Sequence, residues 1–227
     1  MKSLPSNGPL RARLPRLTGV TIAASMLAMC GWCSALTMSF YRITDNASDD
    51  VSNDIFLEVT DLGSGMALFE LSRGDTYEGL IGEVYFQTEG TNIIGVEFDP
   101  VFSAANVVYT SGASPADPPA SNTNDPPDPA TFITSYSFDS HNSEAIQPEA
   151  DLEYGGFKAT YSGTYDDLET ALFNGEVKLA VHVRGIGSQS DTFITGIPTT
   201  TIPEPSVALL TAMGSFFLLR RRRQPSA

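Results

Sequence analysis

Cysteine, histidine and tryptophan are nearly absent from this 227-residue chain, which has two, two and one of them. Both cysteines, Cys30 and Cys33, and the tryptophan, Trp32, lie within the first 35 residues. The rest of the chain therefore has neither a disulfide nor a thiolate metal site to stabilise it. Its stability must come from buried apolar side chains and from backbone hydrogen bonds.

Basic residues are scarce in the middle of the chain. Residues 36–202 contain five Lys or Arg against 26 Asp or Glu, a formal charge of −21. Such a surface repels the phosphates of nucleic acids and anionic lipid headgroups. DNA and RNA are thereby excluded as partners, while divalent cations and neutral sugars remain compatible with this charge.

The usual enzyme motifs are missing as well. His141 and His182 have no neighbour at metal-site spacing, and no nucleophile elbow, phosphate loop or dinucleotide fingerprint occurs. A nucleophilic triad would need one of these two histidines, and nothing local selects a serine partner. Carboxylates are so plentiful that the acid/base pair of a glycosidase can be neither located nor excluded. We therefore predict no catalytic residue and no enzyme activity, with a polysaccharide-active hydrolase left as an alternative.

A stretch rich in oxygen ligands offers a weak candidate for a Ca²⁺ site. It lacks the spacing of an EF-hand and the glycine repeats of calcium-binding β-rolls, so we expect a solvated acidic loop and no cofactor. The frequent aromatic residues, 8 Tyr and 13 Phe, could line a sugar platform but are more typical of strands and cores. A carbohydrate- or Ca²⁺-binding module thus remains an alternative function. The oxygen-rich residues are Asp45, Asn46, Asp49, Asp50, Asn53 and Asp54.

Residues 1–35 are predicted to be a secretory signal peptide. Three arginines at positions 11, 13 and 16 precede an apolar stretch over 17–32, and small residues before Ala35 suit cleavage after it. The apolar stretch is shorter than the roughly 20 residues that a membrane-spanning helix needs, which disfavours a retained anchor. A lipoprotein signal ending at Cys30 is a weaker alternative, because Met29 is bulky where a small residue is expected.

Residues 36–197 are predicted to form one all-β domain, an antiparallel sandwich or jelly roll. Residues 177–184 alternate apolar and polar side chains, so one face should pack on a core and the other should contact water. Two stretches, 54–73 and 79–98, have the pattern of hairpins with turns at 61–65 and 89–92. Further strands are expected at 39–43, 107–110, 132–138, 157–161 and 191–197.

One short helix is predicted within TYDDLETALFNGEV, residues 164–177. Thr164 or Asp166 can cap it, and Gly175 should end it. Its apolar face would consist of Leu168, Ala171 and Leu172. Residues 111–131, with six prolines and no aromatic residue, read as a long exposed loop within the domain.

The C-terminal end has three consecutive parts after a short tether, residues 198–202. Pro203, Glu204 and Pro205 precede an apolar segment, 207–219, and then the cluster Arg220, Arg221, Arg222 and Arg223. Thirteen helical residues span about 20 Å, less than the hydrocarbon core of a bilayer, about 30 Å. The arginines should stay on the cytoplasmic side, because positive charge resists translocation.

This three-part order over residues 203–223 resembles the PEP-CTERM sorting-signal proteins. The helix followed by the 177–184 strand and a Gly/Ser loop has a looser likeness to the same family. The resemblance implies recognition of Pro203, Glu204 and Pro205 by an exosortase, after transient inner-membrane anchoring through 207–219. It also implies delivery to the cell surface or the exopolysaccharide matrix of a Gram-negative-type bacterium. We therefore expect an exported, non-enzymatic envelope or matrix protein with a structural or adhesive role.

Overall fold

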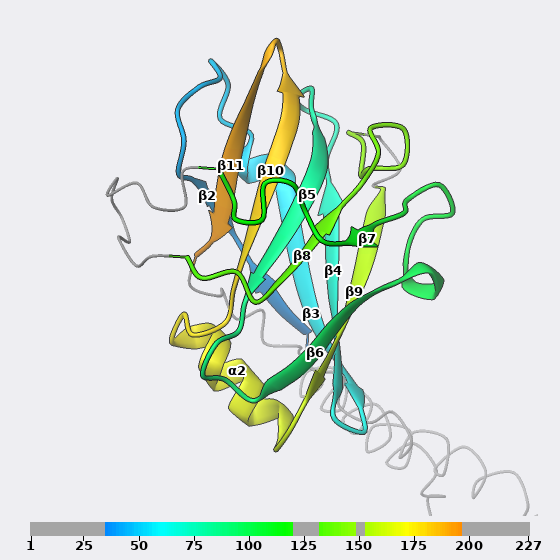
Figure 1. The fold of residues 1–227 in the computed structure, drawn as a ribbon, viewed down its shortest axis with the longest axis vertical. Coiled ribbons are helices and arrows are strands. Elements are labelled where there is room, and N and C mark those ends of the chain that lie inside the picture. The colour runs from blue at the N-terminus through cyan, green and yellow to red at the C-terminus, as the bar shows by residue number, and fades with distance from the viewer. Residues whose placement is uncertain (1–34, 120–131, 149–152, 197–227) are drawn as a thin grey trace, which may run out of the picture. The chain divides into compact units, whose positions relative to one another are not determined.

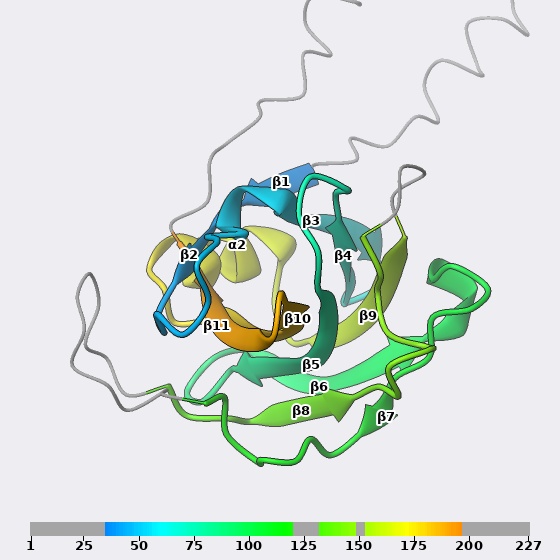
Figure 2. The same cartoon turned by 90° about the horizontal axis from the view of Figure 1, so that it is seen from above.

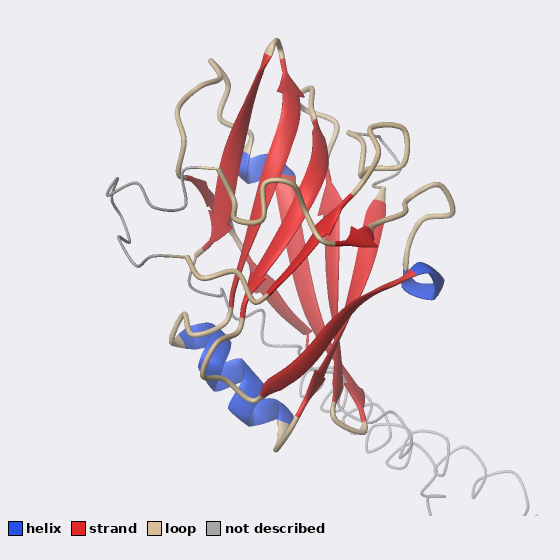
Figure 3. Ribbon diagram, in the orientation of Figure 1, coloured by secondary structure: helices blue, strands red, loops and turns tan. Residues whose placement is uncertain are grey.

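The computed structural model describes residues 35–119, 132–148 and 153–196. These residues form two antiparallel sheets with one α-helix, which confirms the predicted sandwich-like β architecture (Figures 1 and 3). Sheet A has the order β1 (Ala35–Met38), β3 (Ile55–Gly63), β4 (Met66–Arg73), β9 (Tyr154–Tyr161) and β6 (Ile93–Asp99). Sheet B has the order β2 (Phe40–Arg42), β11 (Gln189–Thr195), β10 (Lys178–Ile186), β5 (Leu80–Gln87), β8 (Tyr136–Asp139) and β7 (Thr110–Ser111).

The core lies between the two sheets and is rich in phenylalanine. In β3, for example, Ile55, Leu57 and Val59 are buried and alternate with exposed residues, as the period of two predicts. Phe86 of sheet B contacts Phe69 and Phe157 of sheet A, with ring centroids 5.6 and 5.7 Å apart. These rings are completely buried, so packing across the sheets joins them where no cysteine is available.

The first predicted hairpin is confirmed and the second is wrong. β3 pairs with β4 through a turn in which Ser64 and Gly65 both have positive φ, 57° and 75°. β5, however, pairs with β10 and β8, whereas β6 pairs with β9. The turn after β5 carries the chain from sheet B to sheet A. The true hairpin and the crossover between sheets have the same alternation and the same kind of Gly-containing turn. The local sequence pattern does not specify which strand edges pair.

The predicted helix is confirmed as α2 (Tyr165–Phe173), capped by Thr164. The Thr164 hydroxyl accepts a hydrogen bond from the Asp167 backbone N–H, and the Asp167 carboxylate accepts one from the Thr164 N–H. The predicted apolar face is buried against the main core. The Tyr165 hydroxyl donates to the Val59 carbonyl oxygen at 3.0 Å, which fastens the helix to sheet A. Two short 3₁₀ helices, η1 (Ser52–Asp54) and η2 (Pro100–Phe102), complete the elements described.

The outer face of sheet B is less exposed than the alternation in β10 predicts. Ala180 is buried together with Tyr85, Phe132 and Ile194, and Ala113 packs against this second cluster. The start of the proline-rich segment therefore lies on the sheet instead of extending into solvent. The Tyr85 hydroxyl donates to the carbonyl of Pro115 at 3.2 Å.

Most of the predicted export and sorting signals lie outside the described residues. These are the signal peptide up to residue 34, the tether and the whole of segment 203–223. Ala35 is the first residue of β1 and pairs with Thr60 of β3. Leu36 follows the predicted cleavage point and is buried in the core. Among the described residues, no helix is both long and apolar enough to cross a bilayer.

Candidate functional site: a polar pocket on sheet B

A β-bulge in β5 makes room for the Arg184 side chain on the outer face of sheet B. His182 of β10 lies opposite Glu83, and the next residue, Val183, lies opposite Ile81, which leaves Gly82 as the extra residue of β5. A Cβ atom on Gly82 would lie only 2.3 Å from Nε of Arg184. The glycine therefore lets the guanidinium lie directly against the strand.

Glu83 is the centre of the resulting network. Its side chain is 4% exposed, and its carboxylate is 2.9 Å from Nδ1 of His182. Arg184 donates to the same carboxylate through Nε, at 3.1 Å, and through Nη2. Burial raises the pKa of Glu83, but hydrogen bonds from His182 and Arg184 outweigh it, so the pKa is lowered. The carboxylate is thus held ionised.

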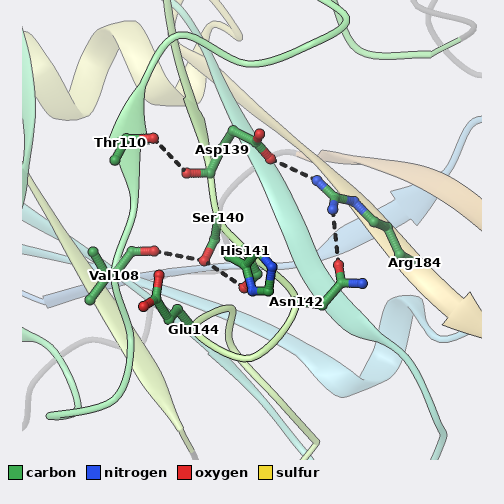
Figure 4. A pocket seen from close by; sticks show the side chains of 8 residues that line it. All are labelled: Val108, Thr110, Asp139, Ser140, His141, Asn142, Glu144 and Arg184. Carbon is green, nitrogen blue, oxygen red and sulfur yellow. Dashed lines mark hydrogen bonds and ion pairs between the residues drawn. The ribbon is translucent and has the colours of Figure 1, made fainter.

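Arg184 connects this network to a pocket between β10, β8 and the loop after β8. Its guanidinium donates to Asp139 at 2.7 Å and to the side-chain oxygen of Asn142 at 3.0 Å (Figure 4). The pocket has a volume of about 470 Å³. It is lined by Val108, Thr110, Asp139, Ser140, His141, Asn142, Glu144 and Arg184.

The pocket side chains are suited to hydrogen bonding. Nδ1 of His141 is 3.0 Å from the Ser143 hydroxyl, within one exposed turn. Among the described residues no carboxylate bonds to His141, so the group that orients the base of a triad is missing. The Ser140 hydroxyl donates to the Val108 carbonyl oxygen and is occupied in holding the pocket wall. The exposed amide and carboxylates of this pocket can accept hydrogen bonds from a hydroxylated ligand.

The acidic stretch considered for Ca²⁺ does not converge on one point. Asp45 pairs with Arg42, and Asp50 accepts a hydrogen bond from the Ser52 backbone N–H. Asp54 is buried and lies 3.8 Å from the guanidinium of Arg73. No three His, Cys, Asp or Glu side chains gather around a possible metal position anywhere in the described part of the chain.

A buried carboxylate from the other end of the domain organises this loop instead. Asp191 accepts hydrogen bonds from the Thr44 hydroxyl and from the backbone N–H of Asn46, both at 2.8 Å. It also accepts one from the backbone N–H of Ala47 at 3.0 Å. Three donors of the loop thus bond to the one carboxylate of Asp191, which fixes the loop to β11.

Of the residues weighed from the sequence, only the two histidines fall at or beside this pocket. His182 lies on the outer face as predicted but is mostly buried and bonded to Glu83, and His141 is exposed. Glu83, Asp139 and Arg184 are not among the site residues predicted from the sequence. A glycine inside an otherwise regular strand pattern was the available signal, since such glycines mark bulges and close approaches.

Comparison with known proteins gives no relative. No family model, no curated protein and no solved structure matches this chain.

Proposed function

We propose that the chain is an exported, surface-sorted, non-enzymatic protein of the cell envelope or exopolysaccharide matrix, with a structural or adhesive role. The observation that carries the proposal is the order of Pro203–Pro205, apolar segment and arginine cluster in residues 203–223. In this scheme an exosortase-type enzyme reads Pro203, Glu204 and Pro205. The segment 207–219 holds the chain in the inner membrane until then.

The geometry of the domain supports this proposal indirectly. Apart from Ala35, the residues of the described strands lie between the two proposed processing signals. The described sandwich is stabilised by a packed aromatic core that contains no cysteine. The polar pocket adds a hydrogen-bonding surface without an assembled catalytic set among the described residues.

The test is mass spectrometry of both termini of the protein recovered from its native cell surface. We expect a start at Leu36 and loss of everything beyond the Pro203–Pro205 region. A variant lacking Arg220 to Arg223 should accumulate unprocessed, whereas a variant with four lysines there should be processed, since either basic residue retains the end in the cytoplasm. Surface protein that keeps an intact tail, or normal delivery without the arginines, would contradict the proposal.

A further inference from the structure

The outer face of sheet A carries two aromatic side chains in one row across the strands. Phe56 of β3 lies opposite Ser72 of β4, which lies opposite Tyr154 of β9. Phe56 is 43% exposed and Tyr154 is 38% exposed. Because neighbouring strands are 4.7–4.9 Å apart, the backbones that carry the two rings are separated by roughly 9.5 Å, with a hydroxyl between them.

A third aromatic ring is brought to this face by a glycine. Gly156 of β9 has no side chain, and a Cβ atom there would lie 2.3 Å from the carbonyl oxygen of Phe102 and 2.8 Å from its Cβ. The Gly156 backbone N–H donates to the Ser103 hydroxyl at 2.9 Å, which fixes η2 against the strand. Phe102, 37% exposed, thus lies beside the row that contains Tyr154. In Figure 2 no described α-helix or strand covers the outer face of β3, β4 and β9, and the short helix η2 lies against β9 at Gly156.

Two carboxylates lie in the next row of the same face. Glu58 of β3 is directly opposite Glu70 of β4, and Gly156 follows on β9. Neither glutamate forms an ion pair with a described residue, because the nearby Lys158 pairs with Glu97 and Asp99. Burial, and then the charge of Glu58, raise the pKa of Glu70. Both carboxylates are thus left as hydrogen-bond acceptors in the row beside Phe56 and Tyr154.

We infer that this face, with Phe56, Tyr154 and Phe102 as the platform and Glu58 and Glu70 as acceptors, binds an uncharged polysaccharide chain. Sugar rings present flat C–H faces that stack on aromatic rings, and hydroxyl groups that donate to carboxylates. The separation of the two ring-bearing strands is comparable to the repeat of two sugars in an extended chain. A second copy of this chain is a less suitable occupant of the face, because its own Glu58 and Glu70 would repel the same carboxylates here. The charge of the domain disfavours acidic polysaccharides for the same reason.

This inference rests on the proposed function, because it names the matrix component that the protein would hold. The exported protein would be titrated by calorimetry with cellohexaose, laminarihexaose, mannohexaose and chitohexaose, and with the neutral polysaccharide fraction of the producing cells. Alginate and polygalacturonate serve as charged comparators. We expect at least one neutral probe to bind and neither acidic polymer to do so.

Single substitutions then locate the binding surface. Phe56→Ala and Tyr154→Ala should each weaken binding about tenfold, as the loss of one aromatic anchor does at other interfaces. Phe173→Ala is the matched control, since Phe173 is 37% exposed but lies on α2. Tyr154→Phe should retain most of the affinity. Asp139→Asn distinguishes this face from the sheet B pocket, because it weakens binding only if the pocket holds the ligand.

The inference fails if no neutral probe binds, if the acidic polymers bind better, or if the two aromatic variants bind like the wild type. It also fails if only the pocket variant loses binding. These outcomes are separate from the sorting test, which reads the termini. A correctly processed protein without glycan affinity would overturn only the present inference, and a glycan-binding protein with an intact tail would overturn only the sorting proposal.

Discussion

Replacing Gly82 by alanine is predicted to disconnect the Arg184 network without touching any of its charged residues. Nothing in the backbone conformation opposes the change, because Gly82 does not have a positive φ. The new methyl group would lie 2.3 Å from Nε and 2.6 Å from Cζ of Arg184, so the guanidinium must leave β5. Glu83 would then be a buried carboxylate whose remaining partner is His182.

The free energy of unfolding should fall by roughly 2 kcal/mol. Hydrogen bonds to charged groups contribute about 1.5–3 kcal/mol each, and Arg184 donates two to Glu83. We take the lower end, because the Arg184 side chain is 30% exposed and regains water, and because Ala is about 0.5–1 kcal/mol better than Gly in a strand. The lowered pKa of Glu83 adds a pH dependence. The network stabilises the fold above the ordinary glutamate range and loses that contribution as the pH falls through the folded-state pKa.

Urea unfolding of the exported protein at pH 7, followed by far-UV circular dichroism, measures this change. Tryptophan fluorescence is unsuitable, since Trp32 lies in the predicted signal peptide. Gly82→Ala, Arg184→Met and the double variant form a cycle, in which the double variant should be no less stable than Arg184→Met alone. A loss below about 0.5 kcal/mol for Gly82→Ala, or additive losses in the cycle, would refute the reasoning.

Two further substitutions test charges elsewhere in the domain. The pKa of Glu70 is raised in the folded state, so its ionisation lowers the free energy of unfolding as the pH rises. Glu70→Gln should therefore raise the free energy of unfolding by about 0.5 kcal/mol at pH 7. It should not change it below the ordinary glutamate pKa, about 4.3. Thermal melting at both pH values checks this, and an equal gain at both would contradict it. Asp54→Ala should cost about 3 kcal/mol, because it leaves the fully buried guanidinium of Arg73 without its carboxylate. Urea unfolding should show partial recovery when Arg73→Met is added; a double variant less stable than Asp54→Ala would argue against the pair.

Much of the local structure was predictable because it depends on neighbours in the chain. Thr164 and Asp167 cap α2 through contacts three residues apart, and the alternation in 177–184 places Val181 and Val183 in the core. The predicted pairing of β5 with β6 was wrong, because these two stretches have the same local pattern as a true hairpin. The aromatic row of Phe56 and Tyr154 was equally out of reach, since it depends on two strand registers that span almost 100 residues.

The sequence by itself determined the features that are local or additive. These are the acidic charge, the lack of cysteine in the domain, the strand periodicity, the capped helix and the order of the predicted export and sorting signals. Only the tertiary structure decided which strands pair, and therefore which side chains meet. Glu83 reaches Arg184 through a bulge, Glu70 lies opposite Glu58 through a register, and Gly156 admits Phe102 through a close approach. Such contacts depend on pairings between distant strands, and the two-residue repeat of a strand records which face a side chain is on but not what lies beside it.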